Sequence, residues 1–380
     1  MSKVKRKKKR KRPAGVVLFS MIVLGLTAFV VFRFEALAGS AWNLTGAGSG
    51  PSRSIASDHK VGYEDSTFFH LEDGYILKCG DGALRYYNTS AQPVWEKALH
   101  GQNVEVDGND KTIAVADPTA GDIFLLDKAG KIKAKKFGLG AISNIMHPSE
   151  NYLVCRMIDK NELRIFDGNL ESIARIPMPD GEVLDIDVSS SESLIAISMF
   201  RLENETYHSQ ILTYQMDGQP IGAINLKGKI ILDIAAIDDK MIGVTDEQAF
   251  SYNIKNELLW EVDLDRVVKK ATVSEDGMIL LNLVKSGEDL TDPRPDNVIK
   301  YIGSDGQSIN EVAIEYDIEE MKRANGQTAF STVDRLYVLS EAGKMESILD
   351  TGGNLRHFNF IGRKFLGVEF GDRLDILKMD

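Results

Sequence analysis

The chain has 380 residues, with 45 Lys+Arg against 56 Asp+Glu and only two cysteines. Nine of the basic residues lie before Pro13, so the remainder carries 36 Lys+Arg against 56 Asp+Glu, a net charge of about −20. Such an acidic chain disfavours binding to nucleic acid or other polyanions. The two cysteines, Cys79 and Cys155, are too few for a disulfide framework in a domain of this size.

The first predicted element is a transmembrane helix over residues 14–34. Residues 14–32 are nineteen positions without a charge, and a helix of that length rises about 28 Å, close to the hydrocarbon thickness of a bilayer. The basic residues of segment 1–13 favour retention of that segment in the cytoplasm. We therefore expect a single-pass cell-membrane protein with a cytoplasmic N-terminus and an extracytoplasmic remainder.

A cleaved secretory signal is the alternative for this region, because Ala36, Leu37 and Ala38 form a small-x-small cleavage site. The apolar run is longer than the usual h-region, and Arg33 and Glu35 crowd the site, so we favour a retained anchor. Residues 35–62 follow as a Gly/Ser-rich linker, which is typical of a flexible tether.

From residue 63 onward, short β-type runs and turn signals recur with a period of roughly 36 to 50 residues. The best-kept unit is a strand that ends in Asp or Asn, a tight turn with Gly or Asn, and a second strand. Two more strand candidates precede each such hairpin, as at residues 184–188 and 194–198. Four strands per unit predict an all-β fold, a β-propeller ectodomain over residues 63–380.

The predicted ring has about eight four-stranded blades. The expected inner strands are centred near Phe68, Val104, Ile145, Ile186, Leu232, Ala271, Glu319 and Phe358. Seven blades is the alternative, because residues 315–324 are charged and could form a helix or loop. The last unit offers only three strands, so we expect residues 54–62 to supply its outer strand and close the ring.

The hairpins resemble those of quinoprotein-type and WD40-type propellers, in which an outer-strand tryptophan docks neighbouring blades. Trp95 and Trp260 lie seven residues after Asn88 and Asn253, as that pattern requires. More broadly, the basic tail, single span, linker and degenerate propeller resemble a family of uncharacterised membrane-anchored proteins of Gram-positive bacteria. This resemblance implies an architecture and says little about activity.

The sequence contains no pattern that indicates catalysis. The cysteine pair beneath the cofactor of alcohol-oxidising quinoproteins is missing, because Cys79 and Cys155 are far apart and fall in different blades. No two of the six histidines have a metal-ligand spacing, and Asp107 to Asp110 lack the remaining oxygen ligands of a calcium loop. We expect no catalytic residue, no cofactor and no bound metal.

Two insertions, residues 201–209 and 285–297, fall between the second and third strands of their blades. Turns at that point emerge on one face together with the connections between blades, so this face is the candidate interaction surface. Its candidate residues are Arg201, Glu203, Glu205, Tyr207, His208, Glu288, Asp289, Asp292, Arg294 and Asp296. Either loop alone would equally be expected from a tolerated insertion without any binding role.

These features predict a monomeric, membrane-tethered, non-enzymatic module that binds an envelope protein or a cell-wall polymer and no nucleic acid. One alternative is a degenerate hydrolase or lyase that uses carboxylates at the mouth of the central channel. Another is a ligand sensor, which would have to signal through a partner because the cytoplasmic segment is too short for a domain.

Overall fold

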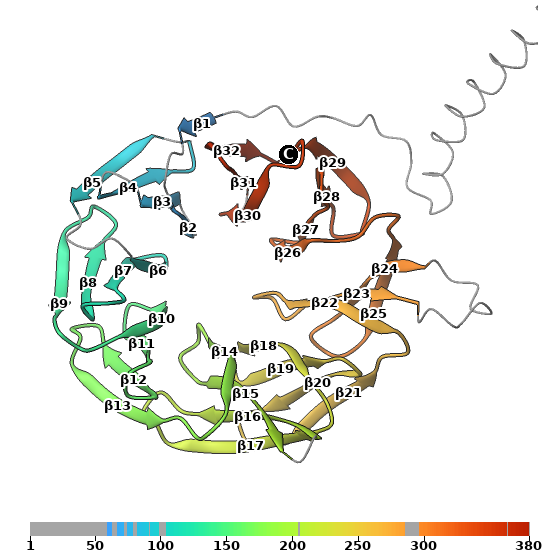
Figure 1. Ribbon diagram of the computed structural model, residues 1–380, viewed down its shortest axis with the longest axis horizontal. Coiled ribbons are helices and arrows are strands. Elements are labelled where there is room, and N and C mark those ends of the chain that lie inside the picture. The colour runs from blue at the N-terminus through green and yellow to red at the C-terminus, as the bar shows by residue number, and fades with distance from the viewer. Residues whose placement is uncertain are drawn as a thin grey trace, which may run out of the picture. The chain divides into compact units, whose positions relative to one another are not determined.

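The computed structural model describes residues 59–62, 67–71, 74–78, 82–90, 92–98, 104–203, 206–285, 296–362 and 364–379. These residues form eight four-stranded antiparallel sheets, arranged as the blades of a closed ring (Figure 1). The predicted all-β propeller is therefore confirmed. Within the described ranges, no helix is long and apolar enough to cross a membrane, and the predicted span over residues 14–34 lies outside them.

The strands of each blade follow one another in sequence from the channel outwards. Blade 1 has β2 (Thr67–Leu71), β3 (Gly74–Lys78), β4 (Ala83–Asn88) and β5 (Pro93–Ala98). Blade 2 has β6 (Glu105–Gly108), β7 (Thr112–Asp117), β8 (Asp122–Asp127) and β9 (Ile132–Lys136). Blade 3 has β10 (Ile142–Ser149), β11 (Tyr152–Met157), β12 (Glu162–Asp167) and β13 (Ser172–Pro177). Blade 4 has β14 (Glu182–Val188), β15 (Ile195–Glu203), β16 (Thr206–Tyr214) and β17 (Pro220–Lys227).

The second half of the ring repeats this order. Blade 5 has β18 (Ile231–Ile237), β19 (Lys240–Thr245), β20 (Gln248–Asn253) and β21 (Leu258–Asp263). Blade 6 has β22 (Val267–Val273), β23 (Ile279–Val284), β24 (Asn297–Ile302) and β25 (Ser308–Ala313). Blade 7 has β26 (Glu320–Ala324), β27 (Gln327–Ser331), β28 (Arg335–Leu339) and β29 (Met345–Asp350). Blade 8 has β30 (Leu355–Ile361), β31 (Phe365–Phe370) and β32 (Arg373–Lys378), with β1 (His59–Gly62) as its outer strand.

The ring closes through the pairing of the first strand with the last. His59 lies opposite Ile376 and Gly62 opposite Arg373, so β1 completes the blade that the C-terminal strands begin. This is the position at which the sequence predicts a closing strand from residues 54–62. The pairing covers the edge of β32, which would otherwise offer unpaired backbone groups to another chain.

The hydrophobic core lies between the blades, because each second and third strand is packed on both faces. In β7, five of six residues are buried, whereas the outer strand β21 alternates between exposed and half-buried residues. One core cluster joins Ala114 and Ile123 of blade 2 to Cys155 and Phe166 of blade 3. Apolar positions on both faces of the inner strands thus explain why the sequence forms stacked sheets.

The seven-blade alternative is wrong, because the charged stretch before residue 325 is the inner strand β26. Glu320 and Lys322 are only half-buried, while Met321 between them is buried against the neighbouring blades. An inner strand with one face on a water-filled channel can carry charges at every second position. High charge therefore does not argue against a strand at this place in a propeller.

Two tryptophans dock their blades onto the next blade in the ring. The indole N–H of Trp95 donates to the backbone oxygen of Lys128 at 3.2 Å, and that of Trp260 donates to the oxygen of Ser304 at 3.0 Å. Gly130, with a φ of 79°, lets the turn between β8 and β9 lie against the indole ring of Trp95. A Cβ at this position would be only 2.8 Å from that indole. Each indole ring therefore fills the space between the outer strands of two neighbouring blades.

Candidate interaction surfaces

The antiparallel order of the strands gives the ring two faces of different character. The insertion face is the side that carries the turns between the second and third strands of each blade, such as residues 158–161, and the connections from blade to blade. The turn face is the opposite side, which carries the turns between the first and second strands and between the third and fourth strands, such as residues 150–151 and 168–171.

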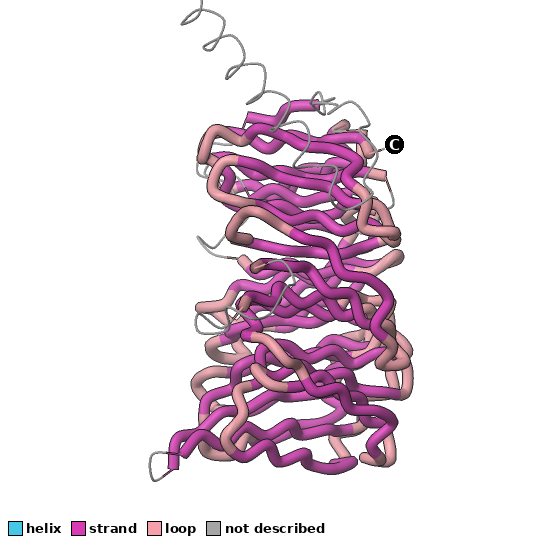
Figure 2. The backbone as a smooth tube through the Cα atoms, turned by 90° about the vertical axis from the view of Figure 1, so that its right-hand side faces the viewer, coloured by secondary structure: helices cyan, strands magenta, loops and turns pink. Residues whose placement is uncertain are grey.

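The first predicted insertion is a β-hairpin and not a loop. β15 and β16 are nine residues long, and their register continues through Arg201 opposite His208 and Leu202 opposite Tyr207. The inner strand β14 begins opposite Phe200, so the last residues of β15 extend beyond it. This hairpin projects at the lower left of Figure 2, which is the side that faces the viewer in Figure 1.

The described part of the hairpin tip has an apolar surface with an ion pair on the neighbouring positions. Leu202 is 60% exposed and Tyr207 is 46% exposed, and the rings of Phe200 and Tyr207 lie 5.6 Å apart. Arg201 Nε lies 3.1 Å from the carboxylate of Glu203.

Two further candidate residues belong to the same hairpin. Nε2 of His208 lies 4.0 Å from the carboxylate of Glu203, beside the ion pair. Glu205 lies outside the described residues. The structure thus brings four of the five candidates of this insertion together.

The second insertion is described only at its base. Lys285 Nζ lies 2.9 Å from Asp296 Oδ1, and the backbone N–H of Lys285 donates to the oxygen of Asp296 at 3.0 Å. The remaining candidates lie outside the described residues: Glu288, Asp289, Asp292 and Arg294. The closed base places this insertion on the insertion face, two blades from the hairpin.

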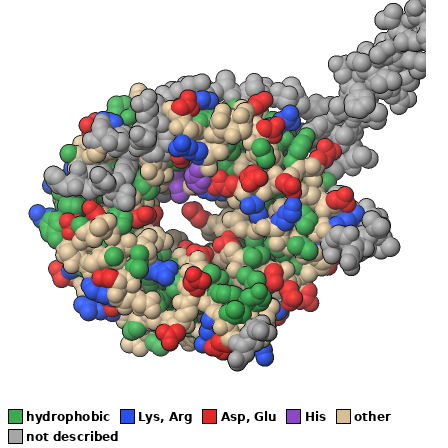
Figure 3. All heavy atoms as spheres, viewed as in Figure 1, with side chains coloured by type: hydrophobic (Ala, Val, Ile, Leu, Met, Phe, Trp, Pro, Cys, Tyr) green, Lys and Arg blue, Asp and Glu red, His purple; other side chains and the backbone are tan. Residues whose placement is uncertain are grey.

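Exposed apolar side chains gather on the insertion face. Besides Leu202 and Tyr207, the large exposed apolar residues of this face are Phe137, Ile158, Leu184, Leu232, Val267 and Val333. They come from blade connections, second-to-third turns and the starts of inner strands. Figure 3 looks onto this face and shows hydrophobic side chains between the channel and the rim, beside β15 and β16.

A polar cluster faces the channel where the ring closes. Nζ of Lys322 lies 3.2 Å from Glu320 and 3.1 Å from Nε2 of His357, whose Nδ1 lies 2.9 Å from Glu320. Because an ammonium group only donates, Nε2 accepts and Nδ1 carries the proton, which makes His357 neutral in this arrangement.

A second histidine extends the cluster to blade 1. The side-chain amide of Asn359 donates to Nδ1 of His70 at 2.6 Å. The side chain of His70 is open to the channel, and the surrounding protein, with the positive charge of Lys322 nearby, lowers its pKa to about 4. Histidines are visible at the channel rim in Figure 3. Both histidine rings are therefore held by hydrogen-bonding neighbours.

Carboxylates on the inner strands connect neighbouring blades. Oδ2 of Asp107 accepts the backbone N–H of His147 at 2.6 Å, and Asp187 accepts that of Ala236 at 2.7 Å. Asp233 accepts the N–H of Val273 in the same way at 2.7 Å. We call these three residues the aspartate staples.

Burial raises the pKa of all three staples. The pKa of Asp187 is about 6 and that of Asp233 is about 7. The sequence reasoning missed all three staples, although polar residues at every second position of inner strands, as in residues 184–188, were a usable signal. These carboxylates converge on the channel, but each also holds two inner strands together.

Within the described ranges, no group of three His, Cys, Asp or Glu side chains could hold a metal ion. Cys155 is a buried free thiol, and burial raises its pKa, so it remains a neutral apolar group. Cys79 lies outside the described residues.

The closed ring of four-stranded sheets defines an eight-bladed β-propeller with one face enlarged by insertions. Residues 52–368 match DUF5711, a family of unknown function, and the chain belongs to this family. No curated protein matches the sequence.

Several solved structures share the fold at low sequence identity. BamB from Moraxella catarrhalis has a TM-score of 0.57 and 12% identity, over 85% of this chain and 99% of that chain. The C-terminal WD40 domain of Sif2 has a TM-score of 0.64 and 10% identity, over 87% and 100%. Saccharomyces cerevisiae Sqt1 has a TM-score of 0.56 and 12% identity, over 86% and 100%. At such identities the likeness concerns the fold alone.

Proposed function

We propose that the protein is a non-enzymatic binding module, tethered to the cell membrane on its extracytoplasmic side, that holds an envelope protein on its insertion face. The observation that carries this proposal is the hairpin tip, with Leu202 and Tyr207 exposed on a face that collects further apolar side chains. Exposed apolar residues are normal when scattered, but on one rigid face they mark a protein-binding surface.

The hairpin is held firmly enough to display its tip. Ser209 Oγ donates to the backbone oxygen of Lys229 at 2.8 Å, and the N–H of Gly228 donates to the oxygen of Tyr207 at 2.8 Å. A pre-ordered surface loses little conformational freedom on binding, which favours affinity. Most of the large exposed apolar side chains of this face are aliphatic, so we favour a protein over a cell-wall polymer.

The channel groups support binding rather than catalysis. The aspartate staples accept hydrogen bonds from backbone N–H groups of the next blade, and the two channel histidines are hydrogen-bonded to neighbouring side chains. A general acid or base needs a free site directed at a substrate. The carboxylate-based hydrolase or lyase therefore lacks a supporting observation in these residues.

Site-specific photo-crosslinking in cells tests the insertion face. A photoreactive residue at Tyr207 or Ile158 should crosslink to the same envelope protein, and one at the outer-strand residue Val94 should not. Leu202→Glu should abolish the crosslink from position 158, whereas Val94→Glu should leave it unchanged. Equal crosslinking from all three positions, or attachment to polysaccharide alone, would contradict the proposal.

The tether is tested separately by fractionation. The full-length protein should sediment with membranes, resist high salt and dissolve in detergent, because an apolar span holds it. Externally added protease should remove the propeller from spheroplasts. Release by salt, or protection from the protease, would overturn the proposed topology.

A further inference from the structure

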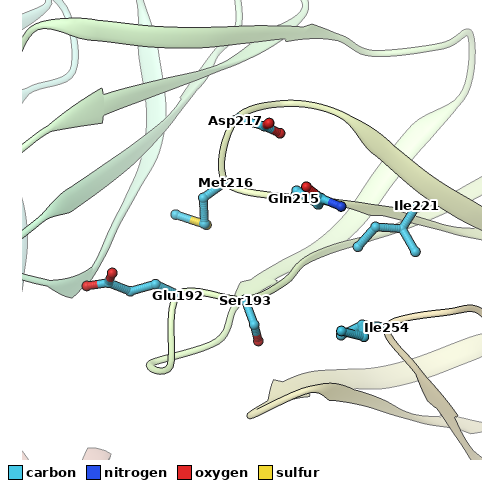
Figure 4. A pocket seen from close by; sticks show the side chains of 7 residues that line it. All are labelled: Glu192, Ser193, Gln215, Met216, Asp217, Ile221 and Ile254. Carbon is cyan, nitrogen blue, oxygen red and sulfur yellow. The ribbon is translucent and has the colours of Figure 1, made fainter.

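A groove opens on the turn face between blades 4 and 5, on the side of the ring opposite the hairpin tip. It has a volume of about 310 Å³, and Figure 4 shows the side chains that line it. The lining residues are Glu192, Ser193, Gln215, Met216, Asp217, Ile221 and Ile254. Ile221 and Ile254 supply apolar lining on one side and Met216 on the other, beside Glu192, and Glu192 and Asp217 add carboxylates.

A second groove continues the first onto blade 3. It has a volume of about 540 Å³, and Glu192 lines both grooves. Each groove forms where the two turns of one blade meet its neighbour, so the pair is a consequence of the repeat. We call the joined grooves the turn-face track. One end is apolar, at Met216 and Ile254, and the other is polar, at Asp167 and Asn169.

The turn-face track is acidic. Four carboxylates line it, those of Glu150, Asp167, Glu192 and Asp217, against the ammonium group of Lys133. Glu150 is paired with Lys111 at 2.7 Å, so the excess of negative charge lies at Asp167, Glu192 and Asp217. Backbone N–H donation from Glu171 keeps the pKa of Asp167 below its usual value. A carboxylate-lined track with one apolar end fits a basic segment that also carries an apolar side chain.

The backbone turn at Glu192 does not require a glutamate, and its carboxylate accepts the side-chain amide of Asn151 at 2.8 Å, across the boundary between blades 3 and 4. Glu192 has a φ of 61°, and its N–H donates to the oxygen of Ser189 at 2.9 Å. The matching turn of blade 6 is closed by Gly277, with a φ of 78° and an N–H bond to Ser274 at 2.8 Å. Glycine suits this conformation better, so the turn itself does not call for a glutamate.

We infer that the turn-face track binds an extended basic segment of a second partner protein. An apolar side chain enters the end formed by Met216, Ile221 and Ile254, and lysine or arginine side chains lie along Glu192 toward Asp167. This site is independent of the insertion face. A propeller with both surfaces would join two proteins on opposite sides of one ring.

The test uses the full-length protein in mild detergent and a blocked synthetic peptide with one leucine followed by two lysines. Fluorescence anisotropy measures the affinity, and methyl NMR of Met216 and Ile254 locates the peptide. Both methyl signals should shift, and that of Met157 should not. The same peptide with glutamates for lysines, or glycine for leucine, should bind at least tenfold more weakly.

Charge-neutral variants separate binding from stability. Glu192→Gln with Asp167→Asn keeps oxygen acceptors for Asn151 and the turn, yet should weaken binding of the lysine peptide by about tenfold, as expected for two exposed ion pairs. Glu341→Gln, another exposed acid of the turn face, should leave the affinity unchanged. Undetectable binding at 1 mM, equal binding of the glutamate peptide, or unshifted Met216 would overturn the inference.

Discussion

The blades are joined by different chemistry at the channel and at the outer rim. Near the axis, the aspartate staples connect adjacent inner strands through single hydrogen bonds. At the rim, Trp95 and Trp260 fill the wider gap with an indole ring. Blades converge toward the axis and diverge outward, so short polar groups suffice inside and large rings are needed outside.

The largest expected effect comes from removing a rim tryptophan. Trp260→Ala should lower the free energy of unfolding by about 2 to 3 kcal/mol, because it leaves a space between blades 5 and 6. Urea denaturation of the full-length protein measures this change. Val94→Ala, at an exposed rim position, is the control and should cost less than about 0.5 kcal/mol. Equal effects of the two variants would show that the rim indole does not join the blades.

Removing a staple at the channel should cost less. Asp107→Ala leaves the backbone N–H of His147 without its acceptor and should destabilise the fold by about 1 to 2 kcal/mol. Asp107→Asn retains an acceptor oxygen and should cost less than the alanine variant. If both variants behaved alike in denaturant titrations, the hydrogen bond would not be the stabilising feature.

Stability should rise as the pH falls from 8 to 6.5. The folded pKa values of about 6 for Asp187 and 7 for Asp233 lie above the ordinary 3.8, so the folded state binds more protons than the unfolded state in this window. The two carboxylates alone contribute a gain of about 1 kcal/mol. His70 and His147 offset part of this gain as the pH approaches 6.5, because their lowered pKa values make the unfolded state the stronger proton binder at these two positions.

A single substitution checks the origin of this pH dependence. Asp233→Asn should remove most of the slope between pH 8 and 6.5, since Asp233 has the higher of the two pKa values. Denaturation midpoints at several pH values measure it. If the free energy of unfolding of the variant depended on pH as that of the unaltered protein does, a group other than Asp233 would take up the proton.

The smallest expected effect on stability belongs to the binding surfaces. Leu202→Ser with Tyr207→Ser removes exposed apolar groups at the hairpin tip and should change the free energy of unfolding by less than about 0.5 kcal/mol. The same double variant should lose the photo-crosslink from Ile158. A large loss of stability would show that the hairpin tip contributes to the fold, as the contacts between blades do, and is not merely an exposed surface.

Much of the fold was predictable because blade repeats leave local signals. Alternating strands and Asp or Asn turns located the blades, and the missing outer strand of the last unit pointed to residues 54–62. The hairpin of blade 4 was expected as a loop, since polar residues such as Glu203 and Thr206 hide the continued pairing. The staples and the turn-face track escaped prediction, because their residues lie on separate blades.

The sequence by itself determined the β-rich repeat and the candidate membrane anchor, and it limited the ring to seven or eight blades, because these depend on periodicity and composition along the chain. Only the tertiary structure decided which residues meet. Asp107 reaches His147, and Met216 shares a groove with Ile254, through the curvature of the closed ring. Contacts between blades depend on how the sheets are rotated about the axis, and no local pattern in the chain encodes that rotation residue by residue.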